Sequence, residues 1–320
     1  MQYRILGATG LRVSEIGFGA WGIGGDAKGA VAYGPTDDGE SKKALRHAFD
    51  AGVNFFDTAD FYGFGHSEEM LGAGLAAIRS HVIIATKVGM LDAAGNQDFS
   101  TGHIRRSLEQ SLKRLGTDYI DLYQLHSPPI SLVESNGEIL DCLKSLQREG
   151  KIRSIGISVR SPAEGLSAAN LGFQCLQVNF NLLDQRAAEN GLFEICQKKN
   201  IGVIGRTPLC FGFLTGQYTS QNKFAESDHR NRWKPAQRDK WAGAYPMFLS
   251  ALRDPGTQTP AQFALRFCLS FPAISSVIPG MLTAAHVDDN TPASNLGVLT
   301  DAERLAIMGI YKENDFFLGP

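Results

Sequence analysis

Short apolar runs alternate with amphipathic segments eight times along this chain, and this alternation limits its fold more than any other feature. The short runs are mostly β-branched, which is typical of parallel strands buried on both faces. The segments between them repeat apolar residues at helical spacing, as Ile104, Leu108, Leu112 and Leu115 do within 101–116. Eight strand–helix units in a chain of 320 residues predict a (β/α)8 barrel.

The predicted elements are these. Strands are expected at 14–21, 53–59, 82–89, 119–127, 152–158, 175–181, 202–209 and 274–280. Helices are expected at 39–52, 66–78, 101–116, 138–150, 161–170, 190–200 and 259–270, with two more near the C-terminus. A doubly wound sheet is the alternative, but no acidic residue ends a second strand at the distance that the glycines of 17–25 require. Residues 1–320 are therefore expected to form one barrel domain.

The stretch 210–255 follows the seventh predicted strand and is too long for an ordinary connection in a barrel. We expect it to be a functional lid or substrate loop. Its Trp233 and Trp241 are expected either to contact the substrate or to form the core of the loop itself. Phe316 and Phe317 are expected to be packing residues, with a substrate contact as the less favoured role.

Charge and composition exclude several classes of protein. The net charge of −2 gives no basic surface for nucleic acid or anionic lipid. Residues 1–17 lack the pattern of a signal peptide, and no apolar run approaches the length of a membrane helix. The five cysteines are too scattered for a disulfide framework or a zinc site, so we expect reduced thiols and a cytoplasmic protein. Five further histidines are expected to be solvated and to form no metal site: His47, His66, His81, His103 and His229.

Polar residues end the predicted strands, where a barrel carries its active site. The second strand ends at Asp57 with Tyr62 in the following loop, and the third and fourth end at Lys87 and His126. A buried lysine needs a counter-charge, which Asp57 on the adjacent strand can supply. An ammonium beside a phenol favours the phenolate, so Tyr62 can release a proton. A neutral His126 can polarise a carbonyl oxygen, and the hydride would have to come from a bound cofactor.

Each of these four residues also has an ordinary structural interpretation. Asp57 could be a turn residue, Lys87 could reach the surface, His126 could end its strand and Tyr62 could pack beside Phe61. These interpretations leave unexplained why four such residues converge at successive strand ends, so the joint site is favoured.

The segments FFDTADFYG, ATKVG and DLYQLHSPP, which carry these residues, resemble the aldo-keto reductase family in its bacterial and potassium-channel-β-subunit-like branch. GKIRSIGIS, LQVNFNLLDQR, TPLCFGFLTG and VIPG…HVDDN resemble its later segments in the same order. The resemblance covers essentially the whole chain. It implies a barrel that binds NADPH, less often NADH, in an extended form and reduces a small-molecule carbonyl substrate.

The resemblance also implies the role of each residue. Tyr62 would be the general acid, Lys87 would assist it, Asp57 would pair with Lys87, and His126 would orient the carbonyl. Ser158 and Gln177 would hold the nicotinamide carboxamide, and Trp21 would line the mouth of the site. The residues along the pyrophosphate would be Thr207, Pro208, Leu209 and Gly212, and those near the adenosine would be Gly280, Thr283, His286 and Asn290.

The chain departs from the family pattern at three places. Val159 stands where many members have an asparagine that holds the carboxamide. Arg206 stands where many have an aromatic residue stacked on the nicotinamide, and a guanidinium there could lie on the ring and repel its oxidised form. Near the adenosine end, Asp288 and Asp289 stand close to His286 without the arginine or lysine that often binds the 2′-phosphate.

Two other functions stay open. A barrel lyase could form a Schiff base on Lys87, with Tyr62 and Asp57 moving protons. A regulatory subunit could keep the cofactor and turn over slowly. The physiological substrate, the preferred direction of reaction and the oligomeric state do not follow from the sequence.

Overall fold

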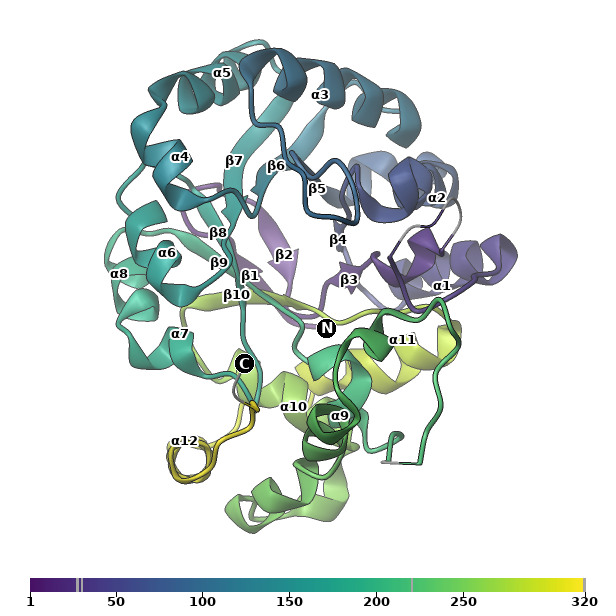
Figure 1. Cartoon of the computed structure of the whole chain (residues 1–320), viewed down its shortest axis with the longest axis vertical. Coiled ribbons are helices and arrows are strands. Elements are labelled where there is room, and N and C mark those ends of the chain that lie inside the picture. Colours follow the sequence, from purple (N-terminus) through teal and green to yellow (C-terminus); the bar gives the residue numbers. More distant parts are fainter. Residues whose placement is uncertain (27–28, 30, 220, 319–320) are drawn as a thin grey trace.

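A sheet of eight parallel strands forms the centre of the molecule in the computed structural model, which describes residues 1–26, 29, 31–219 and 221–318. The strand order is β10-β9-β8-β7-β6-β5-β4-β3. Backbone bridges from Ile16 to Val277 and from Gly19 to Gly280 join the two ends of the sheet, and helices surround it (Figure 1). The predicted (β/α)8 barrel is confirmed.

Each predicted strand and helix has a counterpart in the structure. The barrel strands are β3 (Phe18–Gly19), β4 (Phe55–Asp57), β5 (Ile83–Val88), β6 (Ile120–His126), β7 (Ile152–Ser158), β8 (Cys175–Asn179), β9 (Gly202–Arg206) and β10 (Ile274–Ile278). The helices are α1 (Asp38–Asp50), α2 (His66–Leu75), α3 (Thr101–Leu115), α4 (Ile130–Ser135), α5 (Gly137–Arg148), α6 (Pro162–Ala168), α7 (Arg186–Glu189), α8 (Leu192–Lys198), α9 (Pro235–Ala242), α10 (Pro260–Leu269), α11 (Ala284–Asn290) and α12 (Asp301–Glu313). Helices α4, α7 and α9 were not predicted.

The register of the strands sets their carboxyl ends in one layer. Lys87 pairs with Gln124 across β5 and β6, and His126 pairs with Ser158 across β6 and β7. Ser158 in turn pairs with Gln177 on β8. Polar side chains that are far apart in sequence therefore meet above the barrel.

An N-terminal hairpin, which was not predicted, covers the opposite end of the barrel. Strands β1 (Tyr3–Ile5) and β2 (Arg12–Ser14) pair antiparallel, and each has three residues, too few for an alternating pattern. Leu6, just after β1, and Val13 of β2 are fully buried among apolar side chains of the barrel interior such as Phe55 and Leu122.

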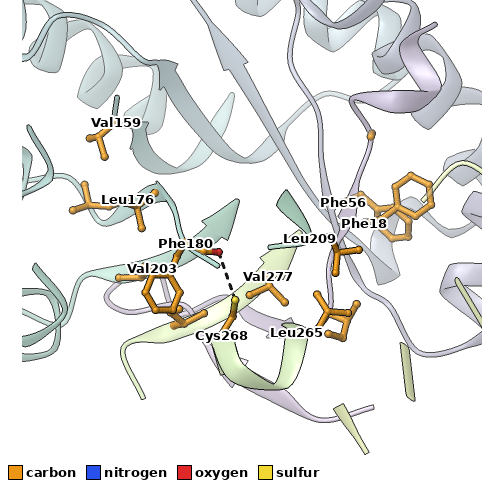
Figure 2. Close-up of a cluster of buried hydrophobic side chains, with 14 of the residues drawn as sticks. Phe18, Phe56, Val159, Leu176, Phe180, Val203, Leu209, Leu265, Cys268 and Val277 are labelled. Atoms are coloured by element: carbon orange, nitrogen blue, oxygen red, sulfur yellow. Dashed lines mark hydrogen bonds between the residues drawn. The ribbon is translucent and has the colours of Figure 1, made fainter. Parts of the chain in front are cut away.

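The main core lies between the sheet and its helices. Phe180 stacks on Phe267 and packs edge-on against Phe193 and Phe271. Its carbonyl oxygen accepts a hydrogen bond from the thiol of Cys268 (Figure 2). Burying one such aromatic side chain stabilises the fold by about 1.5–3 kcal/mol, so this cluster helps to hold α8 and α10 against the barrel.

The segment 210–255 has its own packed core and is not an extended loop. Trp241 of α9 is buried against Trp233 and Phe213, and its indole nitrogen donates to the carbonyl oxygen of Phe316 at 2.9 Å. Phe316 is itself buried and stacks on Phe248. The tryptophans and Phe316 therefore tie this segment to the C-terminal residues and do not line the cavity described below.

Helix α2 begins at His66, the first residue of the helix predicted at 66–78. Ser67 is a candidate N-cap by residue type, but Gly65, in the left-handed conformation (φ 96°), precedes the first helical residue, His66. Ser67 lies inside the helix, where its hydroxyl donates to the carbonyl oxygen of Ala20 at 2.8 Å. This bond holds the loop after β3 against α2.

Candidate active site

Polar side chains gather around a cavity of about 500 Å3 at the carboxyl ends of the barrel strands. Lys87, Ser158 and Thr283 are the only residues predicted for the site that are outside its lining. The predicted residues that line it are Trp21, Asp57, Tyr62, His126, Gln177, Arg206, Thr207, Pro208, Leu209, Gly212, Gly280, His286 and Asn290.

Lys87 lies below the cavity floor with no exposed surface. Its ammonium pairs with Asp57 and donates to the carbonyl oxygen of Thr58 at 2.8 Å and to the hydroxyl of Tyr62 at 3.3 Å. Burial opposes the charge, but the carboxylate of Asp57 raises the pKa of Lys87 above its ordinary value. Lys87 is therefore a charged donor whose N–H groups all point at oxygen atoms.

The second oxygen of Asp57 accepts two further hydrogen bonds. Gln177 donates to it at 2.7 Å and Gln124 donates at 3.1 Å. Gln124 is a site residue that was not predicted. It lies two residues before His126 on β6, so strand alternation alone places it on the same face, toward the barrel axis.

His126 faces Tyr62 across the cavity, with their ring centroids 5.7 Å apart and the rings nearly perpendicular. Burial, together with the charges of Lys87 and Arg206, lowers the pKa of His126 well below its ordinary value. The imidazole is therefore neutral at physiological pH, and one ring nitrogen can donate a hydrogen bond.

Arg206 ends β9 beside these groups. Its Nη2 donates to the carbonyl oxygen of Val159 at 3.2 Å, and its buried Nε has no partner among the described residues. Ser158, one residue earlier on β7, is buried, with its hydroxyl 3.4 Å from that of Ser127. Burial lowers the pKa of the guanidinium of Arg206 from its ordinary value.

The chain after Arg206 turns sharply along the cavity wall. Thr207, Cys210 and Phe211 all have positive φ, at 52°, 44° and 57°, which costs free energy in residues with side chains. Asn179 and Asn181 hold the turn, because the hydroxyl of Thr207 donates to Asn179 and its carbonyl oxygen accepts from Asn181 at 3.0 Å. The residues of this wall are Thr207, Pro208, Leu209, Phe211 and Gly212.

The other end of the cavity is at α11. His286 accepts a hydrogen bond from the backbone of Leu282 at 3.2 Å, and burial lowers the pKa of its imidazole from the ordinary value. Asp289 also lines the cavity and accepts from Thr259 at 2.7 Å. Thr283 caps α11 by accepting a hydrogen bond from the backbone of His286.

The prediction that His229 is solvated is wrong. The backbone of His229 donates to the carbonyl oxygen of Ala32 at 2.9 Å, and its ring lies 4.4 Å from that of Trp21. These contacts leave His229 only 5% exposed, and burial lowers the pKa of its imidazole to about 4. Residues 228–230 thus fasten the segment 210–255 onto the loop that follows β3.

Arg230 and Tyr33 complete this outer wall and were also not predicted. The guanidinium of Arg230 is bidentate to Asp228 and lies 4.9 Å from the ring centroid of Tyr33. Both residues line the cavity. Their positions depend on the contact between two loops distant in sequence, for which no local pattern exists.

The cavity fits an extended dinucleotide chemically. It runs from the Tyr62–His126 end to α11, and its lining includes Arg206, whose Nε has no partner among the described residues. Within the described residues no cluster of three His, Cys, Asp or Glu side chains could bind a metal ion. The same part of the chain contains no helix long and apolar enough to cross a membrane.

Comparison with known proteins agrees with this geometry. Residues 15–312 match the sequence profile described as "Aldo/keto reductase family". Aldo-keto reductase YhdN of Bacillus subtilis is 37% identical over 75% of this chain and 72% of its own length. L-galactose dehydrogenase of Arabidopsis thaliana is 33% identical over 92% of this chain and 88% of its own length. The protein of the same plant named "Probable voltage-gated potassium channel subunit beta" is 31% identical over 92% of this chain and 91% of its own length.

The solved holo form of aldo-keto reductase AKR11C1 from Bacillus halodurans has the same fold. It superposes with a TM-score of 0.78 at 28% identity, over 97% of this chain and 96% of that one. The chain therefore belongs to the aldo/keto reductase family, and it is an oxidoreductase that interconverts a carbonyl compound and an alcohol with a nicotinamide cofactor.

Proposed function

We propose that this enzyme reduces an aldehyde or ketone with Tyr62 as the proton donor. The observation that carries the proposal is the contact of the fully buried, charged Lys87 with both the hydroxyl of Tyr62 and the carboxylate of Asp57. The ammonium stabilises negative charge on the phenol oxygen as the proton leaves. The nicotinamide cofactor supplies the hydride when it is bound.

His126 would hold the substrate carbonyl beside Tyr62. A neutral imidazole donates a hydrogen bond to the carbonyl oxygen without competing for the proton of the phenol. The low pKa of His126, caused by burial and by Lys87 and Arg206, supports this role. Asp57 would act through Lys87, because its carboxylate balances the buried ammonium.

The remaining residues would hold the cofactor along the cavity. Gln177 and Arg206 would face the nicotinamide end, and Trp21 would form the mouth. The wall from Thr207 to Gly212 would follow the pyrophosphate, and the residues near the adenosine would be Gly280, Thr283, His286 and Asn290. Ser158 is outside the cavity lining, so its hydroxyl would reach the cofactor only after turning away from Ser127.

The choice between NADPH and NADH depends on the adenosine end. The family resemblance favours NADPH. The carboxylate of Asp289 in the lining favours NADH, because it would repel a 2′-phosphate and accept a hydrogen bond from a 2′-hydroxyl. We keep NADPH as the proposed cofactor and NADH as its alternative, which direct affinity measurements distinguish.

The geometry argues against a Schiff-base lyase. Lys87 is outside the cavity lining, has no exposed surface, and is charged, so it has no free lone pair to attack a carbonyl. Borohydride trapping with a carbonyl substrate should therefore leave Lys87 unmodified. A regulatory role would show as bound cofactor without turnover.

The proposed activity is tested by mixing the enzyme with NADPH or NADH and a series of aldehydes and ketones. We expect carbonyl-dependent loss of the cofactor absorbance and quenching of its fluorescence on binding. Binding without turnover of any carbonyl would contradict the proposal and support a regulatory role. We also propose the reducing cytoplasm as its location, in keeping with five buried, free cysteines.

A further inference from the structure

We propose that Arg206 binds the oxygen of the nicotinamide carboxamide and Gln177 binds the amide group of the same carboxamide. This proposal rests on the proposed function, because it takes the occupant of the cavity to be a nicotinamide dinucleotide. It assigns Arg206 a hydrogen-bonding role that neither the fold nor the proton-donor site requires.

The neighbouring side chains at the ends of β7 and β8 offer no free donor to the cavity. Ser158 is outside the cavity lining and close to Ser127. Val159 has an aliphatic side chain. Gln177 lines the cavity, but its Nε2 is used by Asp57 at 2.7 Å.

Arg206 has the donors that these residues lack. Only its Nη2 is engaged, by the carbonyl oxygen of Val159, and that bond places the guanidinium beside position 159. Its Nε is buried without a partner in the described residues, and no ion pair within them includes its charge. The two carboxylates whose charges act on Arg206 already have other partners, since Asp57 pairs with Lys87 and Asp184 pairs with Arg186.

The guanidinium of Arg206 is half-buried at the cavity wall with only one of its nitrogen atoms engaged, so an acceptor oxygen of a bound molecule would satisfy it. The Oε1 atom of Gln177 indicates which chemical group carries this acceptor oxygen. Because an ionised Asp57 can only accept, the amide of Gln177 must turn its NH2 group toward Asp57, which fixes Oε1 as an acceptor. A site with a donor in Arg206 and an acceptor in Gln177 matches the oxygen and the NH2 of a primary carboxamide, whereas a carboxylate would be repelled by Oε1.

The test uses Arg206→Met and compares two kinds of ligand, one with the nicotinamide and one without it. The dissociation constants of NADPH and NADH are measured by fluorescence, and those of ADP-ribose and its 2′-phosphate, which lack the nicotinamide, are measured by calorimetry. We expect Arg206→Met to weaken binding of the dinucleotides by roughly ten- to a hundredfold, the size of a lost hydrogen bond from a charged donor, with ADP-ribose binding unchanged. Adding Val159→Asn to Arg206→Met should restore part of the lost affinity by placing an amide beside the same site.

Three outcomes would overturn the assignment. Unchanged dinucleotide affinity in Arg206→Met would show that Arg206 does not touch the carboxamide. An equal loss for ADP-ribose would place its effect elsewhere on the cofactor. The third outcome is that Arg206→Met/Val159→Asn binds the dinucleotides no better than Arg206→Met, although thermal melting shows that both variants are folded. An amide at position 159 would then not replace Arg206, and the two positions would not serve the same site.

A measurement on the unaltered enzyme covers the case in which Arg206→Met does not fold. Thionicotinamide adenine dinucleotide and its phosphate replace the carboxamide oxygen with sulfur, a weaker acceptor, and should bind more weakly than their parent cofactors. Equal affinity would contradict the proposal. Failure of the proposed function itself looks different, since then neither the dinucleotides nor ADP-ribose would bind to the unaltered enzyme.

Discussion

Gln177 donates a hydrogen bond of 2.7 Å to Asp57, the same carboxylate that pairs with the buried ammonium of Lys87. A cavity residue at the proposed nicotinamide end is therefore bonded directly to the proposed proton-donor site. A substitution at Gln177 should therefore affect Lys87, and one at Lys87 should affect Gln177. Asp57 is buried, so water cannot replace a lost hydrogen-bond donor.

Gln177→Leu should weaken both stability and cofactor binding. Asp57 would lose one of its buried donors, at a cost of about 1–3 kcal/mol in the free energy of unfolding. Chemical denaturation measures the first effect and fluorescence titration with NADPH and NADH measures the second. Gln197→Leu on the exposed side of α8 is the matched control. Loss of stability with unchanged cofactor affinity would show that Gln177 serves Asp57 alone.

Removing one member of the Lys87–Asp57 pair should be worse for stability than removing both. Lys87→Met leaves a buried, unpaired carboxylate and should cost about 3–5 kcal/mol in the free energy of unfolding. Lys87→Met combined with Asp57→Asn should recover part of that loss. Lys87→Met, Asp57→Asn and the double variant should all lose carbonyl reduction. Additive destabilisation in the double variant would mean that the two charges are not coupled as their contact indicates.

His229 should make the protein less stable in acid. Its pKa is about 4 in the fold because of burial, and near 6.5 when unfolded. The unfolded state therefore binds the extra proton first, so stability is full above pH 6.5 and falls as the pH drops toward 4. His126, whose pKa is also lowered by burial, acts in the same direction.

The contribution of His229 is measured with His229→Gln. The full linkage amounts to about 3 kcal/mol, and the variant should lose that part of the difference in unfolding free energy between neutral and acidic pH. His81→Gln, at an exposed position, should keep the whole difference. An unchanged pH dependence in His229→Gln would show that His229 is protonated in the fold without cost.

Asp289→Asn should shift the balance between the two cofactors toward NADPH. Removing a carboxylate near the 2′ position should raise the NADPH affinity relative to NADH by several-fold, on the order of 1 kcal/mol. Asp288→Asn is the control, because Asp288 pairs with His47 on the surface. The ratio of the two dissociation constants is the measured quantity, and an equal ratio in Asp289→Asn and the unaltered enzyme would remove Asp289 from the adenosine end.

Sequence patterns predicted the strands and helices that have a local pattern and the polar residues at the strand ends. The barrel follows from eight repeats, and the order of its strands brings Asp57, Lys87 and His126 together by register. The structure adds contacts that need two distant segments at once. The burial of His229 against Ala32 and the position of Ser158 outside the cavity lining belong to this class, because both depend on how loops pack above the barrel.

Tyr62→Phe tests the proton-donor assignment most directly. The phenylalanine ring fills the same space but cannot donate a proton, so cofactor affinity should be kept and the rate of carbonyl reduction should fall by roughly a hundredfold or more. Phe61→Leu, at the neighbouring cavity residue, is the control for a change of packing. The decisive measurement is the single-turnover rate of NADPH or NADH oxidation by an aldehyde in Tyr62→Phe. A near-complete loss with unchanged cofactor binding is predicted, and retention of most of the rate would contradict the assignment of Tyr62 as the acid.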